Sequence, residues 1–409
     1  MASAKKVSEQ GDPLDEGMRK EIHAGLPLVE LDSKAHIHHS TFGVGSSGVA
    51  KFTDKQSKLL ILYMGGTMGM KPDEKGVLHQ VPGYLTEQVE RMLAEQHDSF
   101  LPTVTVKEYP SLLHGCDMNP DHWVLIANDL ERNYDEYDGF VIIMGTDTMA
   151  YTASALSFML ENLAKTVILT GSQVPYCKTF SDARRNLLAT ISLACALDIA
   201  EVCVFFDDKL FRGNRTRKAD AGAFDAFSSP NFPPLATLGL SVQVNSSLLL
   251  PQPRGRFKVF TKMDSKMVVV KYVPIFDVDA LLRLANQGTE TCKALVLELY
   301  GTGNAPKDPR LLQTIKRAKE VALLVVVTSQ CARGAVMARA YAVNEHLSEL
   351  GVIPTMDMTT EATCAKIAYL FGKGLAPEQV AAQMMTNLRG ECGSAEHINV
   401  PGVRGVARL

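Results

Sequence analysis

Four side chains suited to acyl transfer stand in three short motifs, two of which carry glycine before the threonine. These are Thr67 in MGGTMG, Thr146 and Asp147 in MGTDTM, and Lys218 in NRTRKAD. A threonine hydroxyl attacks a carbonyl poorly unless a base removes its proton, and a desolvated lysine oriented by a carboxylate can be that base. Glycines before the threonine let backbone N–H groups approach a substrate and stabilise an oxyanion. The set indicates acyl transfer to a threonine without a cofactor.

Short apolar runs precede most of these residues and are typical of buried strands. LLILYM, FVIIM, TVILT and VCVFF end directly before Gly65, Gly145, Gly171 and Asp207. In an open parallel sheet, ligands gather beyond the carboxyl ends of the strands. We therefore expect the hydroxyls, the carboxylate and the lysine to meet at one sheet edge.

Each residue taken alone also has a purely structural interpretation. Thr67 or Ser172 suits a helix N-cap, Asp147 suits the cap of a helix that opens at Met149, and Lys218 suits a solvated loop. Their joint occurrence at successive strand ends favours a site.

Strands that alternate with helix-length segments predict βαβ units and a parallel sheet covered on both faces. The rhythm breaks near Val242, and a second alternation follows with KMVVVKYV, ALVLELYG and VALLVVVTSQ. The predicted fold is α/β, with a larger N-terminal doubly wound, mostly parallel sheet domain and a smaller C-terminal α/β domain. The expected divisions are a poorly structured extension over 1–55, a catalytic domain over 56–243, a linker over 244–265 and a second domain over 266–409.

Composition excludes several classes of protein. The 409 residues carry a net charge of −3, which argues against a nucleic-acid or anionic-membrane binder. No run approaches the ~20 apolar residues of a membrane helix, and the N-terminus lacks a signal-peptide core. The eight cysteines form no C-x-x-C pair, so we expect reduced thiols and a cytoplasmic protein.

Two motifs in the extension do not support a ligand site. Gly43, Gly45 and Gly48 spell GxGxxG, but no apolar strand precedes them, so a glycine linker is the better interpretation. The histidines of the segment 36–39 have no second ligand cluster of suitable spacing. We expect no metal site and no phosphate loop.

The longer motifs resemble the L-asparaginase family of the bacterial cytosolic kind. They are YMGGTMGM, MGTDTMAYTASALSFMLEN, TGSQVP, SDARRN, LFRGNRTRKAD, YGTGNAP and MDMTTEAT, between about Lys58 and Glu391. The resemblance implies hydrolysis of L-asparagine to L-aspartate and ammonia through an acyl-enzyme, with glutamine a minor substrate.

The resemblance also implies residue roles. Thr67 would be the primary nucleophile, and Thr146, Asp147 and Lys218 a second triad, with Thr146 and Asp147 also holding substrate. Active sites shared between subunits imply a homodimer or homotetramer, and they make Asn304 a candidate contributor to a neighbour's site.

The sequence departs from the family pattern in two segments. The carboxylate-binding segment reads HGCDM, so Gly115, Cys116 and Asp117 are the candidate substrate-binding residues; a serine is usual at 115, and we expect Gly115→Ser to lower KM. In the loop after Thr67, Val77 replaces the usual tyrosine. Tyr84 and Tyr341 are the candidate substitutes, with Tyr341 reaching a site across the subunit interface, although packing or surface roles suit both.

Two alternative functions remain open at this stage. One is a catalytically weak asparagine-binding sensor, and the other is the ammonia-releasing subunit of a tRNA-dependent amidotransferase. The complete set of Thr67, Thr146, Asp147 and Lys218 favours the hydrolase.

Overall fold

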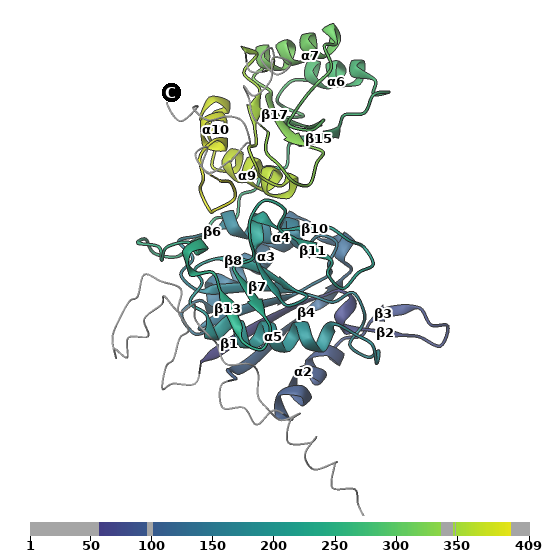
Figure 1. Ribbon diagram of the computed structural model, residues 1–409, viewed down its shortest axis with the longest axis vertical. Coiled ribbons are helices and arrows are strands. Elements are labelled where there is room, and N and C mark those ends of the chain that lie inside the picture. Colours follow the sequence, from purple (N-terminus) through teal and green to yellow (C-terminus); the bar gives the residue numbers. More distant parts are fainter. Residues whose placement is uncertain (1–56, 96–100, 337–346, 348, 394–409) are drawn as a thin grey trace, which may run out of the picture.

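A computed structural model describes residues 57–95, 101–336, 347 and 349–393 of the chain. Two α/β domains follow one another, and the second lies above the first in Figure 1. Among the described residues, no helix has the length and apolar character needed to cross a membrane. The extension predicted over 1–55, with its glycine and histidine motifs, lies outside the described residues.

The first domain is built on an eight-stranded sheet. Its strands are β1 (Lys58–Gly65), β4 (Thr103–Leu113), β5 (Gly139–Ile143), β7 (Thr166–Thr170), β8 (Val202–Phe206), β9 (Lys209–Arg212), β12 (Ala236–Leu238) and β13 (Val242–Val244). Their order is β13-β12-β9-β8-β7-β5-β1-β4. The five strands from β8 to β4 run parallel, while β9, β12 and β13 pair antiparallel. Every residue of β5, β7 and β8 is buried, as expected of strands covered on both faces.

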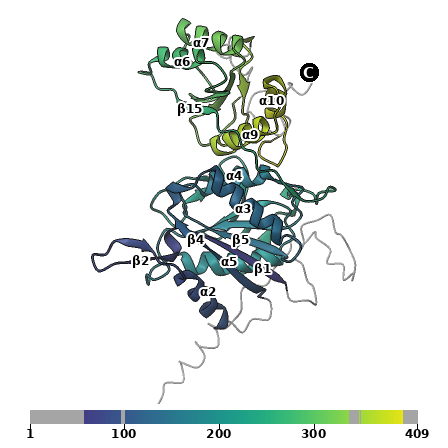
Figure 2. The same cartoon turned by 180° about the vertical axis from the view of Figure 1, so that it is seen from behind.

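Two helices cover each face of this sheet. On one face, α3 (Pro120–Asn133) and α4 (Met149–Met159) pack on side chains such as Phe140 and Ile142. On the other, α2 (Tyr84–Ala94) and α5 (Ala183–Ala196) pack on the alternate residues, among them Ile61 and Val141. Figure 2 shows α3 and α4 on the side of the sheet that faces the second domain, and α2 and α5 on the side away from it.

The second domain has a four-stranded, all-parallel sheet in the order β15-β16-β17-β18. The strands are β15 (Met267–Lys271), β16 (Ala294–Leu299), β17 (Leu324–Ser329) and β18 (Ile353–Pro354). The helices described are α6 (Val278–Asn286), α7 (Pro309–Glu320), α9 (Thr360–Gly372) and α10 (Pro377–Met384). In Figure 1, α6 and α7 lie on the outer side of this sheet and α9 lies between it and the first domain.

The two domains share one hydrophobic core and one buried polar cluster. Buried residues of α4, such as Phe158, belong to the same apolar cluster as Ile367 and Leu370 of α9. Beside them, the carboxylate of Glu161 accepts a hydrogen bond from the Tyr369 hydroxyl at 2.5 Å and pairs with Lys258 at 3.0 Å and with Lys373. These contacts join the first domain, the linker and the second domain.

The predicted fold class is confirmed. The apolar runs TVILT and VCVFF coincide with β7 and β8 residue for residue. The short antiparallel strands β9, β12 and β13 were not expected, because each is three or four residues long and no uninterrupted apolar run marks it.

Candidate active site

The predicted site residues gather where the strand order of the first sheet reverses. From β1 the chain crosses to β4 on one side and then returns to β5 on the other. The carboxyl ends of β1 and β5 therefore flank a topological switch point, where open α/β sheets bind their ligands. Thr67 follows β1, and Thr146 and Asp147 follow β5.

Three glycine-bearing segments approach one another at this point. A Cβ on Gly66 would lie 2.4 Å from the backbone nitrogen of Gly145, and a Cβ on Gly145 would lie 2.4 Å from Cα of Gly115. Gly66 also has φ +93°, a conformation that L side chains rarely adopt. Glycine is therefore required for the segments of Thr67, Gly115 and Thr146 to meet.

Lys218 joins Thr146 and Asp147, as the sequence predicts. Its Nζ lies 2.8 Å from the Thr146 hydroxyl oxygen and 2.7 Å from Asp147 Oδ1. The lysine side chain is 18% exposed and the aspartate side chain 67% exposed. The ammonium is thus largely shielded while the carboxylate faces solvent, which suits a group that also meets a substrate.

Lys218 reaches this edge through a reversal that the sequence did not reveal. After β8 the chain turns back along β9, makes the 3₁₀ turn Gly213–Arg215 and enters β10 (Arg217–Lys218), which pairs with β11 (Phe227–Ser228). Arg215 anchors the turn: its Nη1 pairs with Asp357 Oδ2 at 2.9 Å and its Nε donates to Gly390 O at 2.9 Å. The second domain therefore holds the segment that positions Lys218.

Gln173, which follows β7, is a site residue to which sequence reasoning gave no role. The Thr146 hydroxyl donates to its Oε1 at 3.3 Å. Its Nε2 donates to the carbonyls of Ala221 and Ala223, both at 3.1 Å, and its backbone N–H donates to the Asp182 carboxylate. The amide orientation is fixed by these contacts, so Gln173 gives the Thr146 hydroxyl a second fixed partner in addition to the lysine. Its position directly after a buried strand was the available signal.

Thr67 is half-buried at the first position of a 3₁₀ turn, Thr67–Gly69. Among the described residues, no hydrogen bond links its hydroxyl to Lys218. Gln80, from the hairpin of β2 (Met70–Pro72) and β3 (Leu78–Gln80), braces this region by donating to Gly66 O at 3.3 Å and Leu113 O at 3.2 Å.

Of the two tyrosines that could replace the one missing at Val77, the structure describes Tyr84 but not Tyr341. Val77 is 52% exposed at the tip of the β2–β3 hairpin and offers no hydrogen-bond donor from its side chain. Tyr84 begins α2, and Lys71 lies over its ring at 4.9 Å. Tyr341 lies outside the described residues, so its predicted catalytic role stays a prediction.

The HGCDM segment lies beside the Thr146 turn. Gly115, Cys116 and Asp117 form a short 3₁₀ turn after β4. The Thr148 hydroxyl donates to Gly115 O at 2.6 Å, which ties the segment to the loop that carries Asp147. Cys116 and Asp117 are exposed, consistent with a surface that a small substrate can contact.

Asn304 lies in the second domain, in the turn after β16. Its backbone N–H donates to Tyr300 O at 2.7 Å, and its side-chain Oδ1 is buried without a partner in the part of the chain that the structure describes. None of the contacts described for Asn304 reaches the Lys218 cluster of the same chain. No group of His, Cys, Asp and Glu suited to a metal ion exists among the described residues.

The fold and this cluster define a two-domain α/β protein with a threonine, a lysine and an aspartate at a sheet switch point. The family model "Asparaginase, N-terminal" matches residues 58–250, and the model "Glutaminase/Asparaginase C-terminal domain" matches residues 266–384. The chain belongs to the asparaginase family.

Individual proteins agree with this assignment. The chain is 42% identical to L-asparaginase 1 of Escherichia coli over 82% of its own length and 98% of the relative. It is 32% identical to a glutamyl-tRNA(Gln) amidotransferase subunit of Pyrococcus abyssi, over 88% of this chain and 80% of that one. The crystal structure of L-asparaginase I from Vibrio cholerae matches with a TM-score of 0.76 and 41% identity, covering 83% of this chain and all of the other.

Proposed function

We propose that this protein hydrolyses L-asparagine to L-aspartate and ammonia, with glutamine a minor substrate and without a cofactor. The observation that carries the proposal is the contact of Lys218 Nζ with both the Thr146 hydroxyl and the Asp147 carboxylate. The similarity to L-asparaginase 1 of Escherichia coli over most of the chain supports the choice of substrate.

The proposed chemistry uses Lys218 as the base and Asp147 as the group that holds it. In its neutral form, the Lys218 amine accepts the proton of the Thr146 hydroxyl while Asp147 holds the amine in place. In the first step, the Thr67 oxygen forms a bond to the side-chain carbonyl carbon of asparagine, its proton passes to the leaving nitrogen, the C–N bond breaks and ammonia leaves. In the second step, the Thr146 oxygen that Lys218 has deprotonated takes a proton from the water that attacks the Thr67 ester. The ester C–O bond breaks, Lys218 returns its proton to the Thr67 oxygen, and aspartate is released.

The order in which the two threonines act is the finer part of the proposal. We assign the first attack to Thr67 and the lysine-assisted step to Thr146, with backbone N–H groups of the glycine turns facing the oxyanion. Thr67→Ala and Thr146→Ala should each abolish turnover. Intact-mass measurement after rapid mixing with asparagine tests the order, since only a variant that retains the first nucleophile can carry an added acyl group.

We also propose that active sites are shared between copies of the chain. The Oδ1 of Asn304 supports this, together with the hydroxyls of Tyr300 and Thr302 in the same turn, since all three are buried without a partner within the described parts of the chain. A neighbouring copy's site would satisfy these groups. Sedimentation of wild type and mixing of Asn304→Ala with Lys218→Met chains test it, because shared sites regain activity in mixed oligomers. A cytoplasmic location is proposed as well, supported by eight thiols that form no disulfide.

The ammonia-releasing amidotransferase component is a second candidate, because the amidotransferase relative from Pyrococcus abyssi is similar over 88% of this chain. A catalytically weak sensor is the third. Ammonia release with asparagine and glutamine, measured for wild type and Thr67→Ala, separates them. Turnover by the isolated chain that Thr67→Ala abolishes supports the hydrolase. Binding without turnover supports the sensor, and turnover that requires a captured tRNA-dependent partner supports the amidotransferase.

A further inference from the structure

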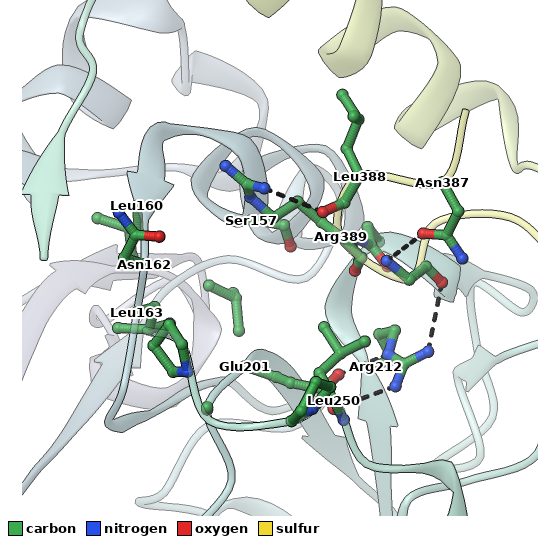
Figure 3. Close-up of a pocket in the computed structure, with 16 residues that line it drawn as sticks. Ser157, Leu160, Asn162, Leu163, Glu201, Arg212, Leu250, Asn387, Leu388 and Arg389 are labelled. Atoms are coloured by element: carbon green, nitrogen blue, oxygen red, sulfur yellow. Dashed lines mark hydrogen bonds and ion pairs between the residues drawn. The ribbon is translucent and has the colours of Figure 1, made fainter. Parts of the chain in front are cut away.

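A turn near the end of the described chain, residues 387–392, lies against the segment that leads to Lys218. That segment, called the connector here, is 212–216 and joins β9 to β10. Figure 3 shows Arg389 of the turn above Arg212 of the connector. The turn follows α10, the last helix described in the second domain, so its contacts with the connector join the two domains.

Two adjacent carbonyls of the turn accept hydrogen bonds from connector side chains. Asn214 Nδ2 donates to Arg389 O at 2.8 Å. The next carbonyl, Gly390 O, accepts from Arg215 Nε at 2.9 Å and from Arg212 Nη1 at 3.4 Å. All three connector side chains are buried, so water cannot easily replace the carbonyls of the turn as their partners. The turn therefore fixes where the connector lies.

The connector is also closed by hydrogen bonds of its own. The buried hydroxyl of Thr216 donates to Arg212 O at 2.7 Å, and the Thr216 backbone N–H donates to Gly213 O at 3.3 Å. Lys218 follows two residues later in β10, where it pairs with Phe227 of β11. Because the connector is internally tied, a shift at its contact with the turn also shifts the backbone of Lys218.

The carboxylate of Glu391 shapes the turn. It is completely buried and accepts from the backbone N–H groups of Leu388 at 3.0 Å and Arg389 at 2.6 Å. Lys366 of α9, equally buried, balances its charge, with Nζ and Oε1 at 2.6 Å. Burying two charges costs free energy that their attraction often only offsets, so an apolar pair would often serve stability as well. An apolar pair, however, would offer the N–H groups of the turn no acceptor.

We propose that Glu391 is a positioning residue for Lys218. Its carboxylate sets the shape of the turn, the carbonyls of the turn hold the connector, and the connector carries Lys218 to Thr146 and Asp147. This inference rests on the proposed function, in which Lys218 serves the hydrolysis of the Thr67 ester. A displaced Lys218 should slow that step and leave the acyl group on the enzyme.

Two glycines with nearly the same backbone conformation provide a matched test. Gly390 has φ +77° and Gly374 has φ +75°. A Cβ on Gly390 would lie 2.6 Å from Arg212 Nη1, whereas a Cβ on Gly374 would meet nothing within 4 Å. The Arg212 guanidinium cannot yield freely, because it also pairs with the buried Glu201 at 3.1 Å. We expect Gly390→Ala to lower kcat for asparagine at least tenfold and Gly374→Ala to change it less than twofold. Ammonia release is measured at a temperature at which calorimetry shows both variants folded.

Intact-mass measurement during turnover identifies the step that is slowed. Lys218→Met gives the reference result, in which an acyl adduct accumulates on Thr67. Gly390→Ala should accumulate the same adduct, while wild type and Gly374→Ala should carry little of it. A substitution that only weakened the fold would not leave a covalent adduct on the folded protein.

Two double variants test Glu391 itself, and both remove the buried ion pair. Lys366→Met combined with Glu391→Gln keeps a side-chain oxygen that can accept from Leu388 and Arg389. Lys366→Met combined with Glu391→Met keeps none. We expect the first to retain kcat within a few-fold, and the second to lose at least tenfold and to accumulate the adduct. This comparison keeps the inference testable should Gly390→Ala fold poorly.

Equal kcat in the two glycine variants, or in the two double variants, would overturn the inference. A lowered kcat in Gly390→Ala without an adduct would also overturn it, provided that Lys218→Met accumulates one. An adduct missing from Lys218→Met as well would contradict the proposed order of steps, and the inference would fall with it. Failure of wild type to release ammonia would instead contradict the proposed function, on which the inference rests.

Discussion

The Lys218 ammonium lies 2.8 Å from the Thr146 hydroxyl oxygen, although 72 positions separate the two residues in the chain. Lys218→Met keeps the length of the side chain and removes the proton acceptor. We expect kcat to fall by roughly 10²–10⁴-fold, the usual contribution of a positioned base, with a smaller change in KM. Steady-state ammonia release measures both.

Lys316→Met on the exposed face of α7 is the matched control for this change. It removes the same charge far from the cluster and should keep wild-type kinetics. A Lys218→Met protein that retains kcat within a few-fold would exclude the lysine as the base.

The approach of Gly66 to Gly145 predicts that a single methyl group there is damaging. In Gly66→Ala, the new Cβ would meet Gly145 N at 2.4 Å, whereas in Gly76→Ala, with a similar φ of +83°, it would meet nothing within 4 Å. We expect Gly76→Ala to cost about 1–2 kcal/mol of backbone strain and to keep activity. Gly66→Ala should carry the same backbone strain and, in addition, have a lower Tm than Gly76→Ala and a kcat reduced at least 10²-fold. Equal behaviour of the two variants would contradict the close approach.

The space beside Gly115 leads to a prediction opposite to the one drawn from the family resemblance, under which Gly115→Ser lowers KM. A Cβ on Gly115 would lie 3.2 Å from Cα of Gly145 and 3.5 Å from the backbone nitrogen of Asp147. The serine therefore presses on the turn that carries Thr146, at a cost of about 1–3 kcal/mol. We expect kcat to fall several-fold without a gain in kcat/KM, while Gly239→Ser, where the nearest atom is at 3.9 Å, is neutral. An improved kcat/KM in Gly115→Ser would restore the original expectation.

Gln173 should set the orientation of the Thr146 hydroxyl. Gln173→Met keeps the volume but removes the acceptor for that hydroxyl and the donors to Ala221 and Ala223. Since one such hydrogen bond contributes about 0.5–1.5 kcal/mol, we expect roughly a tenfold fall in kcat. Gln243→Met, at the exposed middle position of β13, serves as the control. An unchanged kcat would leave Lys218 as the one group that positions the hydroxyl.

Glu161 should make stability depend on pH at the domain junction. Burial raises the pKa of its carboxyl, but hydrogen bonds from Lys373, Tyr369 and Lys258 outweigh burial and lower the pKa from 4.5 to about 2. A lowered folded-state pKa stabilises the protein above about pH 4.5, and this stabilisation is lost as the pH falls toward 2.

Glu161→Gln should therefore lower Tm at pH 7, where the shift corresponds to about 3 kcal/mol at most. Calorimetry between pH 7 and pH 3 should show the two proteins converging in Tm below pH 4.5. A constant difference across that range would contradict the assignment.

The sequence predicts the parallel strands well because a strand buried on both faces is a continuous, mostly apolar run of residues. The strand TVILT is apolar except for its two threonines and entirely buried, so its bounds follow from the sequence. The strands β9 and β12 lack such an apolar run, since the first opens on Lys209 and the second has three residues. Their pairing is fixed by tertiary contacts that no local pattern encodes.

The same distinction applies to the site residues, some of which a local sequence pattern predicts and some of which it does not. Thr146 and Asp147 follow a recognisable strand, so their place at the sheet edge is predictable. The role of Gln173 depends on where the carbonyls of Ala221 and Ala223 lie, and the role of Gly115 depends on its distance to Gly145. Both are three-dimensional relationships between segments distant in the chain.

Helix α4 begins just after the Asp147 turn and packs along α9 of the second domain. The two domains therefore cannot hinge apart around a substrate without moving Asp147. Entry and exit must rely on smaller rearrangements near the sheet edge. A chimera that joins the second domain of one relative to the first domain of another should fold and be active only when α4 and α9 come from the same relative.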